Sequence, residues 1–138
     1  MEGKISAETK IRVRYADTDK MAIVYYANYL TFMEVGRTEF IRQVWRPYAE
    51  FEAEGYILPV LSANIEYLGS ARYDDLLTVK TYLKEFSKVK LYFEYEMFLE
   101  DGTMIARGNT KHCWADENGK PRRLSNEMWN TFLKVNEG

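Results

Sequence analysis

The sequence contains very little cysteine, histidine or proline, and these shortages exclude several classes of protein. Its 138 residues include one cysteine, Cys113, and one histidine, His112. A single cysteine forms no intramolecular disulfide, and the two residues together are too few to ligate zinc in the usual way. No apolar run approaches the ~18 residues of a membrane span, and the first residues lack the apolar stretch of a signal peptide. We therefore expect a cytoplasmic protein with no metal site and no membrane partner.

The chain also lacks an excess of charge of either sign. Its 19 basic and 21 acidic residues give a net charge of −2, so no general electrostatic attraction to nucleic acid is expected. Aromatic residues are abundant at 15%, including 11 tyrosines, which favours a well-packed sheet or contact surfaces over disorder. The length and the absence of linkers or repeats predict a single domain spanning residues 1–138.

Hydrophobic periodicity predicts one long helix among several strands. Residues 28–45 carry apolar side chains at helical spacing, with Asn28 as the N-cap and Pro47 closing the helix. Gly36 lies on the apolar stripe, which predicts a close approach of helix and sheet. Alternating residues predict strands at 11–15, 57–68, 76–86, 89–99 and 104–115. Ser125 is expected to cap a short C-terminal helix.

This order predicts an α+β fold in which an antiparallel sheet of about five strands wraps around the long helix. In the strand at 57–68, Leu61 and Tyr67 alternate toward the core, and Ser62 and Asn64 point away from it. So small a sheet would leave part of its edge and one face exposed. Pairing with a second copy would cover them, so a homodimer is expected.

The segment between the first strand and the long helix combines groups that suit attack on a carbonyl carbon. Asp19 stands in this short loop, where a carboxylate can act as nucleophile or general base. The nearby helix start carries partial positive charge and can stabilise an oxyanion. Asp17, two residues earlier, is expected to bond backbone amides within the loop.

Residues 15–29 read Tyr-x-Asp-Thr-Asp-x-x-x-Ile-Val-Tyr-Tyr-x-Asn-Tyr. With the predicted order of elements, this signature resembles the hotdog-fold acyl-CoA thioesterases. The resemblance is to the 4-hydroxybenzoyl-CoA thioesterase family and its short-chain acyl-CoA branch, and it covers about residues 8–135. Segments 32–40, 71–77 and 84–90 agree with the family in place and character.

The resemblance implies that Asp19 is the catalytic carboxylate and that the backbone amide of Tyr26 polarises the thioester carbonyl. It implies an acyl-CoA substrate, no separate cofactor, and a homodimer with interfacial active sites, often paired again into a homotetramer. Lys88 and Lys90, on the matching hairpin, become the expected contacts to CoA phosphates. In the paired arrangement, Ser62 and Asn64 become candidates to line the acyl tunnel.

The chain departs from the family pattern at two loop positions. Many short-chain members have His where Tyr26 stands, and Gly is frequent at the position of Ala22.

Two other functions remain as alternatives. A hotdog-fold hydratase or dehydratase needs an Asp and His arrangement in the loop and helix, whereas His112 lies far along the chain. A non-catalytic acyl-binding protein would show no turnover.

Ordinary structural roles compete with functional ones at three further residues. Glu34 and Arg37 have the i, i+3 spacing of a helical ion pair. His112 has no triad partner in the sequence, which favours a packed histidine over a catalytic base.

Overall fold

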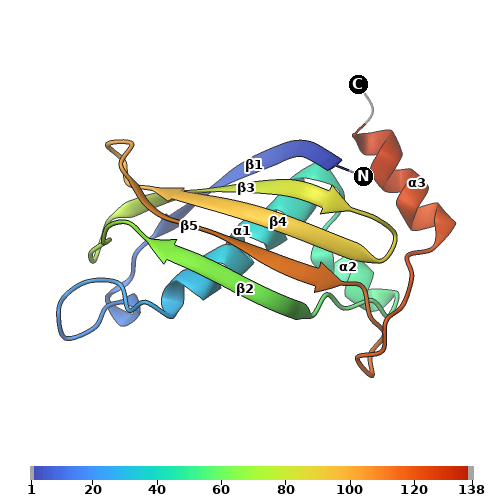
Figure 1. Cartoon of the computed structure of the whole chain (residues 1–138), viewed down its shortest axis with the longest axis horizontal. Helices are drawn as coiled ribbons and strands as arrows, with labels where there is room; N and C mark the ends of the chain where they lie inside the picture. The colour runs from blue at the N-terminus through green and yellow to red at the C-terminus, as the bar shows by residue number, and fades with distance from the viewer. Residues whose placement is uncertain (1, 137–138) are drawn as a thin grey trace.

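The computed structural model describes residues 2–136 and has one five-stranded antiparallel sheet packed against a long helix (Figure 1). Met1, Glu137 and Gly138, which the predicted domain span includes, lie outside the described residues. The elements in chain order are β1 (Glu2–Arg12), the 3₁₀-helix η1 (Tyr15–Asp17), α1 (Asn28–Val44), α2 (Tyr48–Ala53), β2 (Val60–Tyr67), β3 (Leu76–Phe86), β4 (Lys90–Phe98), β5 (Met104–Cys113) and α3 (Asn126–Val135). The predicted α+β hotdog architecture is confirmed.

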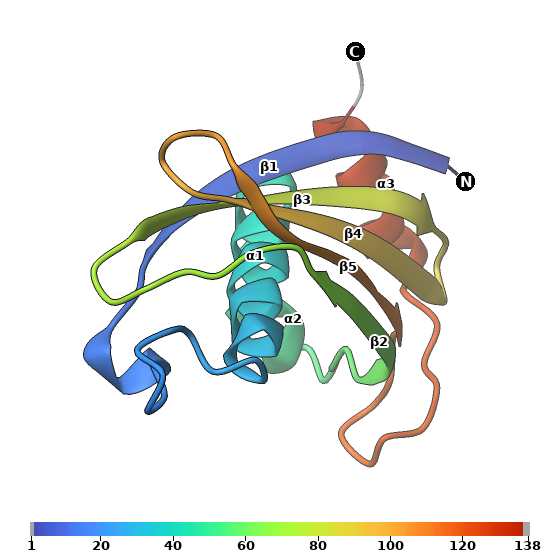
Figure 2. The ribbon, with the colours of Figure 1, turned by 60° about the vertical axis from the view of Figure 1, so that its left-hand side comes forward.

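The sheet order is β1-β3-β4-β5-β2, so β1 and β2 form its two edges. One face packs on α1 and the other face is open, while the segment between β1 and α1 hangs from one end of the sheet (Figure 2). The hairpin between β3 and β4 lies at the opposite end, because Arg12 pairs with Leu76 and Phe86 pairs with Leu91. Within the described part of the chain, no helix is long and apolar enough to cross a membrane.

The strand predicted at residues 11–15 overlaps a longer strand only at residues 11 and 12, and the prediction was wrong for residues 13–15. β1 begins at Glu2, and its half-buried Ile5, Ala7 and Ile11 alternate with exposed residues. Small and polar residues among the inward positions weaken this alternation in the sequence. The chain leaves the sheet at Arg12 and enters η1 instead of continuing as a strand.

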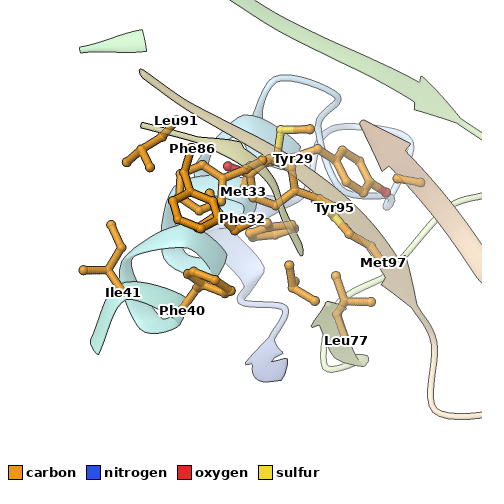
Figure 3. Close-up of a cluster of buried hydrophobic side chains, with 14 of the residues drawn as sticks. Tyr29, Phe32, Met33, Phe40, Ile41, Leu77, Phe86, Leu91, Tyr95 and Met97 are labelled. Atoms are coloured by element: carbon orange, nitrogen blue, oxygen red, sulfur yellow. The ribbon is translucent and has the colours of Figure 1, made fainter. Parts of the chain in front are cut away.

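The core lies between α1 and the inner face of the sheet. Apolar residues from the buried side of α1 meet residues of β3 and β4, and Figure 3 labels Tyr29, Phe32, Met33, Phe40, Ile41, Leu77, Tyr95 and Met97 among them. A Cβ on Gly36 would lie 2.7 Å from Thr81 Oγ1 and 2.9 Å from Val79 Cγ1. The predicted close approach of helix and sheet at Gly36 is therefore confirmed, because only glycine fits this contact without displacement.

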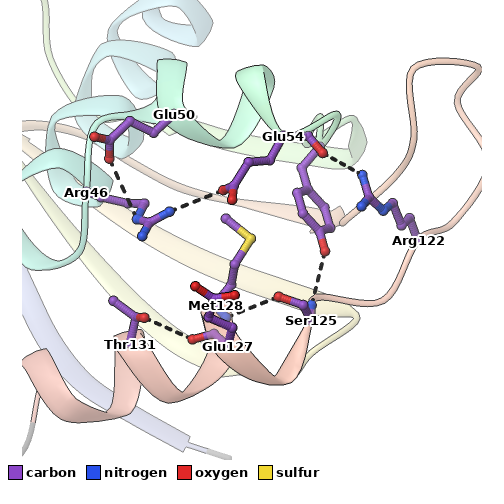
Figure 4. Close-up of polar contacts among 9 residues, drawn as sticks. Arg46, Glu50, Glu54, Arg122, Ser125, Glu127, Met128 and Thr131 are labelled. Carbon is purple, nitrogen blue, oxygen red and sulfur yellow. Dashed lines mark hydrogen bonds and ion pairs between the residues drawn. The ribbon is translucent and has the colours of Figure 1, made fainter.

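Two short helices close the end of the core near the C-terminus. The sequence analysis missed α2, which follows Pro47 directly and buries Phe51 in a stacked contact with Trp114. Arg46, just before α2, forms an ion pair of 3.2 Å with Glu54, just after it (Figure 4). Other polar contacts in the same view bind α3, including the bond of 3.1 Å from Met128 N to Ser125 Oγ. The predicted capping role of Ser125 is thus confirmed.

The edge strand β2 is more exposed than its pattern indicated. Leu61 and Tyr67, expected to face the core, are 58% and 45% exposed, whereas Ile65 packs against the core. A register shift between Val60 and Ser62 contributes to this difference because it breaks the strict alternation of the strand. The exposed edge that the sequence predicted is present, with large apolar side chains along it.

Candidate active site

The loop containing Asp19 is anchored by Asp17, as the sequence predicted. Asp17 is buried, and its carboxylate accepts hydrogen bonds from Arg14 N at 2.9 Å and Arg14 Nη2 at 3.1 Å. Its backbone oxygen accepts from Tyr25 N and from Asn28 Nδ2, both at 2.9 Å. One residue thus ties the start of the loop to the start of α1. Asn28 is the first helical residue and Ala27 the flanking one, so the predicted N-cap role of Asn28 was wrong.

Asp19 stands in a tight turn and is half-buried. Its N–H donates to Ile23 O at 2.9 Å, and its Oδ1 accepts from Met21 N at 2.8 Å. No hydrogen bond within the described residues uses Oδ2. One carboxylate oxygen is therefore held by the backbone while the other is available to a reactant or a water molecule.

The backbone conformation of the same turn favours glycine at position 22. Ala22 has φ 62°, in the left-handed region that glycine adopts readily and alanine does not. Its N–H donates to Asp19 O at 3.0 Å, which closes the turn. Val24 N donates to Ala71 O at 2.8 Å and fixes the far side of the turn against the segment before β3.

The segment just before α1 contains a backbone donor that is unused within residues 2–136. Asn28 N donates to Tyr25 O at 2.9 Å and Leu30 N to Ala27 O at 3.1 Å, whereas Tyr26 N has no acceptor in residues 2–136. Tyr67 Oη donates to Tyr26 O at 2.9 Å, so the end of β2 holds this peptide in place. An unused N–H at the positive end of a helix is suited to stabilising a developing oxyanion.

Aromatic side chains gather around this donor. The pKa of the Tyr25 phenol is raised, chiefly by a hydrogen bond with the Tyr26 side chain and to a smaller extent by the charge of Asp19. The Tyr25 and Tyr26 rings lie 4.7 Å apart, and Tyr67 contacts Tyr26 edge to face. Asp19 and the start of α1 therefore share one aromatic, largely exposed surface.

The predicted CoA-binding lysines lie at the other end of the sheet in the same chain. Lys88 Nζ donates to Asn126 Oδ1, at the start of α3. Lys90 is exposed and lines a hollow of about 480 Å³ together with Leu61 and His112. A single chain therefore does not bring Lys88 or Lys90 near Asp19.

The two predicted tunnel residues lie on the edge strand. Asn64 Nδ2 donates to Asn109 Oδ1 at 3.2 Å, and both residues line a hollow on the open face of the sheet. Ser62 is half-buried and pairs in register with Lys111 of β5. No bond in the described residues links either of them to the Asp19 loop.

Sequence reasoning missed a groove between α1 and β2. Its lining includes Leu30 and Met33 from the helix and Val60 and Ala63 from the strand. The sequence signal was ambiguous because the same apolar residues fit a closed core equally well. The groove exists because β2 lies exposed at the sheet edge and leaves the space between itself and α1 open.

A five-stranded sheet wrapped on one helix, with a carboxylate loop at the helix start, defines a hotdog-fold protein with a candidate site for carbonyl chemistry. The profile of the thioesterase-like superfamily matches residues 13–132. The chain belongs to this superfamily and is an enzyme of the thioesterase class, as the resemblance predicted.

Individual relatives agree with this assignment. A putative acyl-CoA thioesterase of Bacillus subtilis, YneP, is 35% identical over 116 residues, which cover 83% of this chain and 84% of the relative. The acyl-CoA thioester hydrolase YbgC of Escherichia coli is 32% identical over 83% of this chain and 86% of its own. The structure of a DHNA-CoA thioesterase from Staphylococcus aureus superposes with a TM-score of 0.87 at 33% identity, covering 94% of this chain and 89% of that one.

Proposed function

We propose that this chain hydrolyses acyl-CoA thioesters, with Asp19 as nucleophile or general base and the Tyr26 N–H as oxyanion donor. The proposal rests on one arrangement: the loop that leads into α1 contains a carboxylate oxygen of Asp19 and, seven residues later, the backbone N–H of Tyr26, both without a partner in residues 2–136. The names of the relatives support the substrate class, because each describes a thioesterase or a thioester hydrolase acting on a CoA ester.

Two chemical routes use the same groups. In one, an Asp19 oxygen attacks the thioester carbon, expels the CoA thiolate and forms a mixed anhydride that water then hydrolyses. In the other, Asp19 removes a proton from a water molecule as that water attacks. In both routes negative charge develops on the carbonyl oxygen, where the Tyr26 N–H donates a hydrogen bond. A thiolate leaves readily, so neither route calls for a metal or a redox cofactor.

A dimer formed along β2 would complete this site. Two strands related by a twofold axis run antiparallel, so the Leu61 end of one β2 meets the Tyr67 end of the other. That arrangement sets Lys90 of one copy near Asp19 of the other. It also covers the exposed apolar side chains Leu61 and Tyr67. Further pairing into a homotetramer and the cytoplasmic location stay predictions.

In this dimer, Lys90 and the neighbouring Lys88 supply cations to the phosphates of CoA. Lys90 is the better placed, since Lys88 already donates to Asn126. Replacing Lys90 by Ala should raise KM for an acyl-CoA but leave KM for the matching acyl-pantetheine, which lacks the nucleotide, unchanged. An equal rise for both substrates would contradict phosphate binding. The predicted contact of Ser62 and Asn64 with the acyl group is not part of this proposal, because Asn64 lines a hollow on the open face of the sheet.

The catalytic assignment is tested by following thiol release from a panel of acyl-CoAs. Asp19→Asn keeps an acceptor for Met21 N but removes the charge, and hydrolysis should fall by about 10²-fold or more. Asp101 is a matched control, because its Oδ1 also accepts from the backbone two residues ahead, Thr103 N, at 2.8 Å. Asp101→Asn should keep full activity.

Equal rates in Asp19→Asn and the unaltered enzyme would refute the role of Asp19. The absence of turnover on every thioester would instead point to a non-catalytic acyl-binding protein.

A further inference from the structure

A buried chain of hydrogen bonds crosses the inner face of the sheet behind the groove. His112 Nδ1 lies 3.2 Å from Pro59 O, and His112 Nε2 lies 2.7 Å from Thr110 Oγ1. Thr110 Oγ1 also lies 2.7 Å from Tyr95 Oη. All three side chains are at most 2% exposed.

The direction of this chain follows from its last acceptor. Pro59 O only accepts, so Nδ1 of His112 carries the proton and Nε2 accepts from the Thr110 hydroxyl. The Thr110 oxygen then accepts from the Tyr95 hydroxyl. The three polar hydrogens of His112, Thr110 and Tyr95 each have an acceptor in this arrangement. The Tyr95 oxygen keeps a lone pair for a donor on the helix side.

Arg37, on α1, is the charged group that acts on this chain. Burial raises the pKa of Tyr95, and the Arg37 guanidinium opposes the rise through its charge and through side-chain hydrogen bonding. Burial also lowers the pKa of His112 to about 4, with a further contribution from the charge of Arg37. The charge of the guanidinium therefore acts on both ends of the buried chain.

Arg37 is half-buried and takes part in no ion pair formed within the described residues. The i, i+3 pair with Glu34 that the spacing favours is absent there. Other arginines of the same region do pair, as Arg42 does with Glu39. A guanidinium has five N–H donors, so most of those on Arg37 are left for another acceptor.

The position of Arg37 along the groove indicates what that acceptor is. Arg37 and Glu34 line two adjoining hollows, one of about 200 Å³ beside Val60 and one of about 430 Å³ beside Tyr48. Arg37 lies eleven residues after Tyr26, or about 16 Å along a helix. Because helical side chains lean toward the N-terminus, the guanidinium falls on the order of 10 Å from the proposed carbonyl site.

We propose that Arg37 is a specificity-determining residue that binds an oxygen at the distal end of an acyl group lying between α1 and β2. The proposal rests on the function proposed above and names the substrate class of that site. It assigns to the groove an acyl chain of medium length that ends in a neutral hydroxyl.

The charges of the groove select the hydroxyl over two other end groups. A hydroxyl accepts from Arg37 and donates to Glu34, so both charged groups keep a partner. A terminal carboxylate would face Glu34 and also Glu52, which lines the second hollow. A plain alkyl chain would displace water from the guanidinium without replacing its hydrogen bonds, which costs binding free energy.

The test compares kcat/KM for octanoyl-CoA, 8-hydroxyoctanoyl-CoA and 7-carboxyheptanoyl-CoA. The unaltered enzyme should prefer the hydroxy substrate over both others by about tenfold or more. Arg37→Met keeps the apolar stem but removes the donors, and it should bring the hydroxy-to-alkyl ratio to about one. Arg42→Met is the control on the same helix and should keep the ratio of the unaltered enzyme.

Hydrolysis without preference for the hydroxy substrate, or an unchanged ratio in Arg37→Met, would overturn the role of Arg37 while leaving the proposed function intact. Failure to hydrolyse any of the three substrates would overturn both.

The link between Arg37 and the buried chain is tested by Tyr95→Phe, which removes the Tyr95 hydroxyl. In the unaltered background this substitution should lower the hydroxy-to-alkyl ratio, and in the Arg37→Met background it should change the ratio no further. A merely structural role would lower the rates on both substrates together in both backgrounds. If Tyr95→Phe changed the hydroxy-to-alkyl ratio equally in the two backgrounds, Tyr95 would act independently of Arg37, and the proposed link would be refuted.

Discussion

Acidification should destabilise this protein through His112 in particular. The imidazole is 1% exposed, and its pKa is lowered to about 4, first by burial and then by the charge of Arg37. In the unfolded chain the same group has a pKa of about 6.5. Above pH 6.5 it is neutral in both states and contributes no pH dependence. As the pH falls below 6.5, the unfolded state binds the proton first, so the free energy of unfolding decreases.

The size of the loss follows from the two pKa values. Between them the free energy of unfolding falls by about 1.4 kcal/mol per pH unit, which gives about 2 kcal/mol at pH 5 and about 3 kcal/mol at pH 4. Below pH 4 both states are protonated and the loss reaches its limit. For a domain of 138 residues, such a loss is a large part of a total stability of about 5–15 kcal/mol.

The assay is urea unfolding at several pH values between 7.5 and 4, for the unaltered protein and for His112→Gln. Glutamine can donate toward Pro59 O and accept from Thr110 but does not titrate, so it isolates the histidine from carboxylates that titrate in the same range. Between pH 7.5 and pH 4, the unaltered protein should lose about 3 kcal/mol more of its free energy of unfolding than His112→Gln loses. Parallel curves for the two proteins would refute the reasoning.

Two substitutions test the backbone and packing of the region around α1. Ala22→Gly should raise the free energy of unfolding by about 0.5–1 kcal/mol, because φ is 62° at this exposed position; a fall in thermal stability would contradict the strain at Ala22. Gly36→Ala gains about 1 kcal/mol of helix propensity but places a Cβ 2.7 Å from Thr81 Oγ1. We expect overpacking to dominate, with a net loss of about 1–2 kcal/mol in urea unfolding; a more stable variant would show that β3 yields at this contact.

The sequence could predict the elements whose pattern is long and local. The helix from Asn28 and the strand ending at Phe98 carry many apolar residues at one clear period, so their type could be predicted without tertiary contacts. α2 was missed because six residues are too few to show a helical period. Its stability comes from packing, chiefly of Phe51 on Trp114, which is distant in sequence.

By itself, the sequence determined the fold class, the family, and the position of Asp19 in the loop that precedes the long helix. These depend on residue order and on a loop motif whose parts are neighbours in the chain. The tertiary structure alone decided that one oxygen of Asp19 is held and that Tyr26 N has no acceptor among residues 2–136, because hydrogen bonds depend on geometry and not on residue type. It also decided that Arg37 lines the groove between α1 and β2 and that a buried chain of hydrogen bonds ends at His112, since the strands meet α1 only when the sheet has wrapped around it.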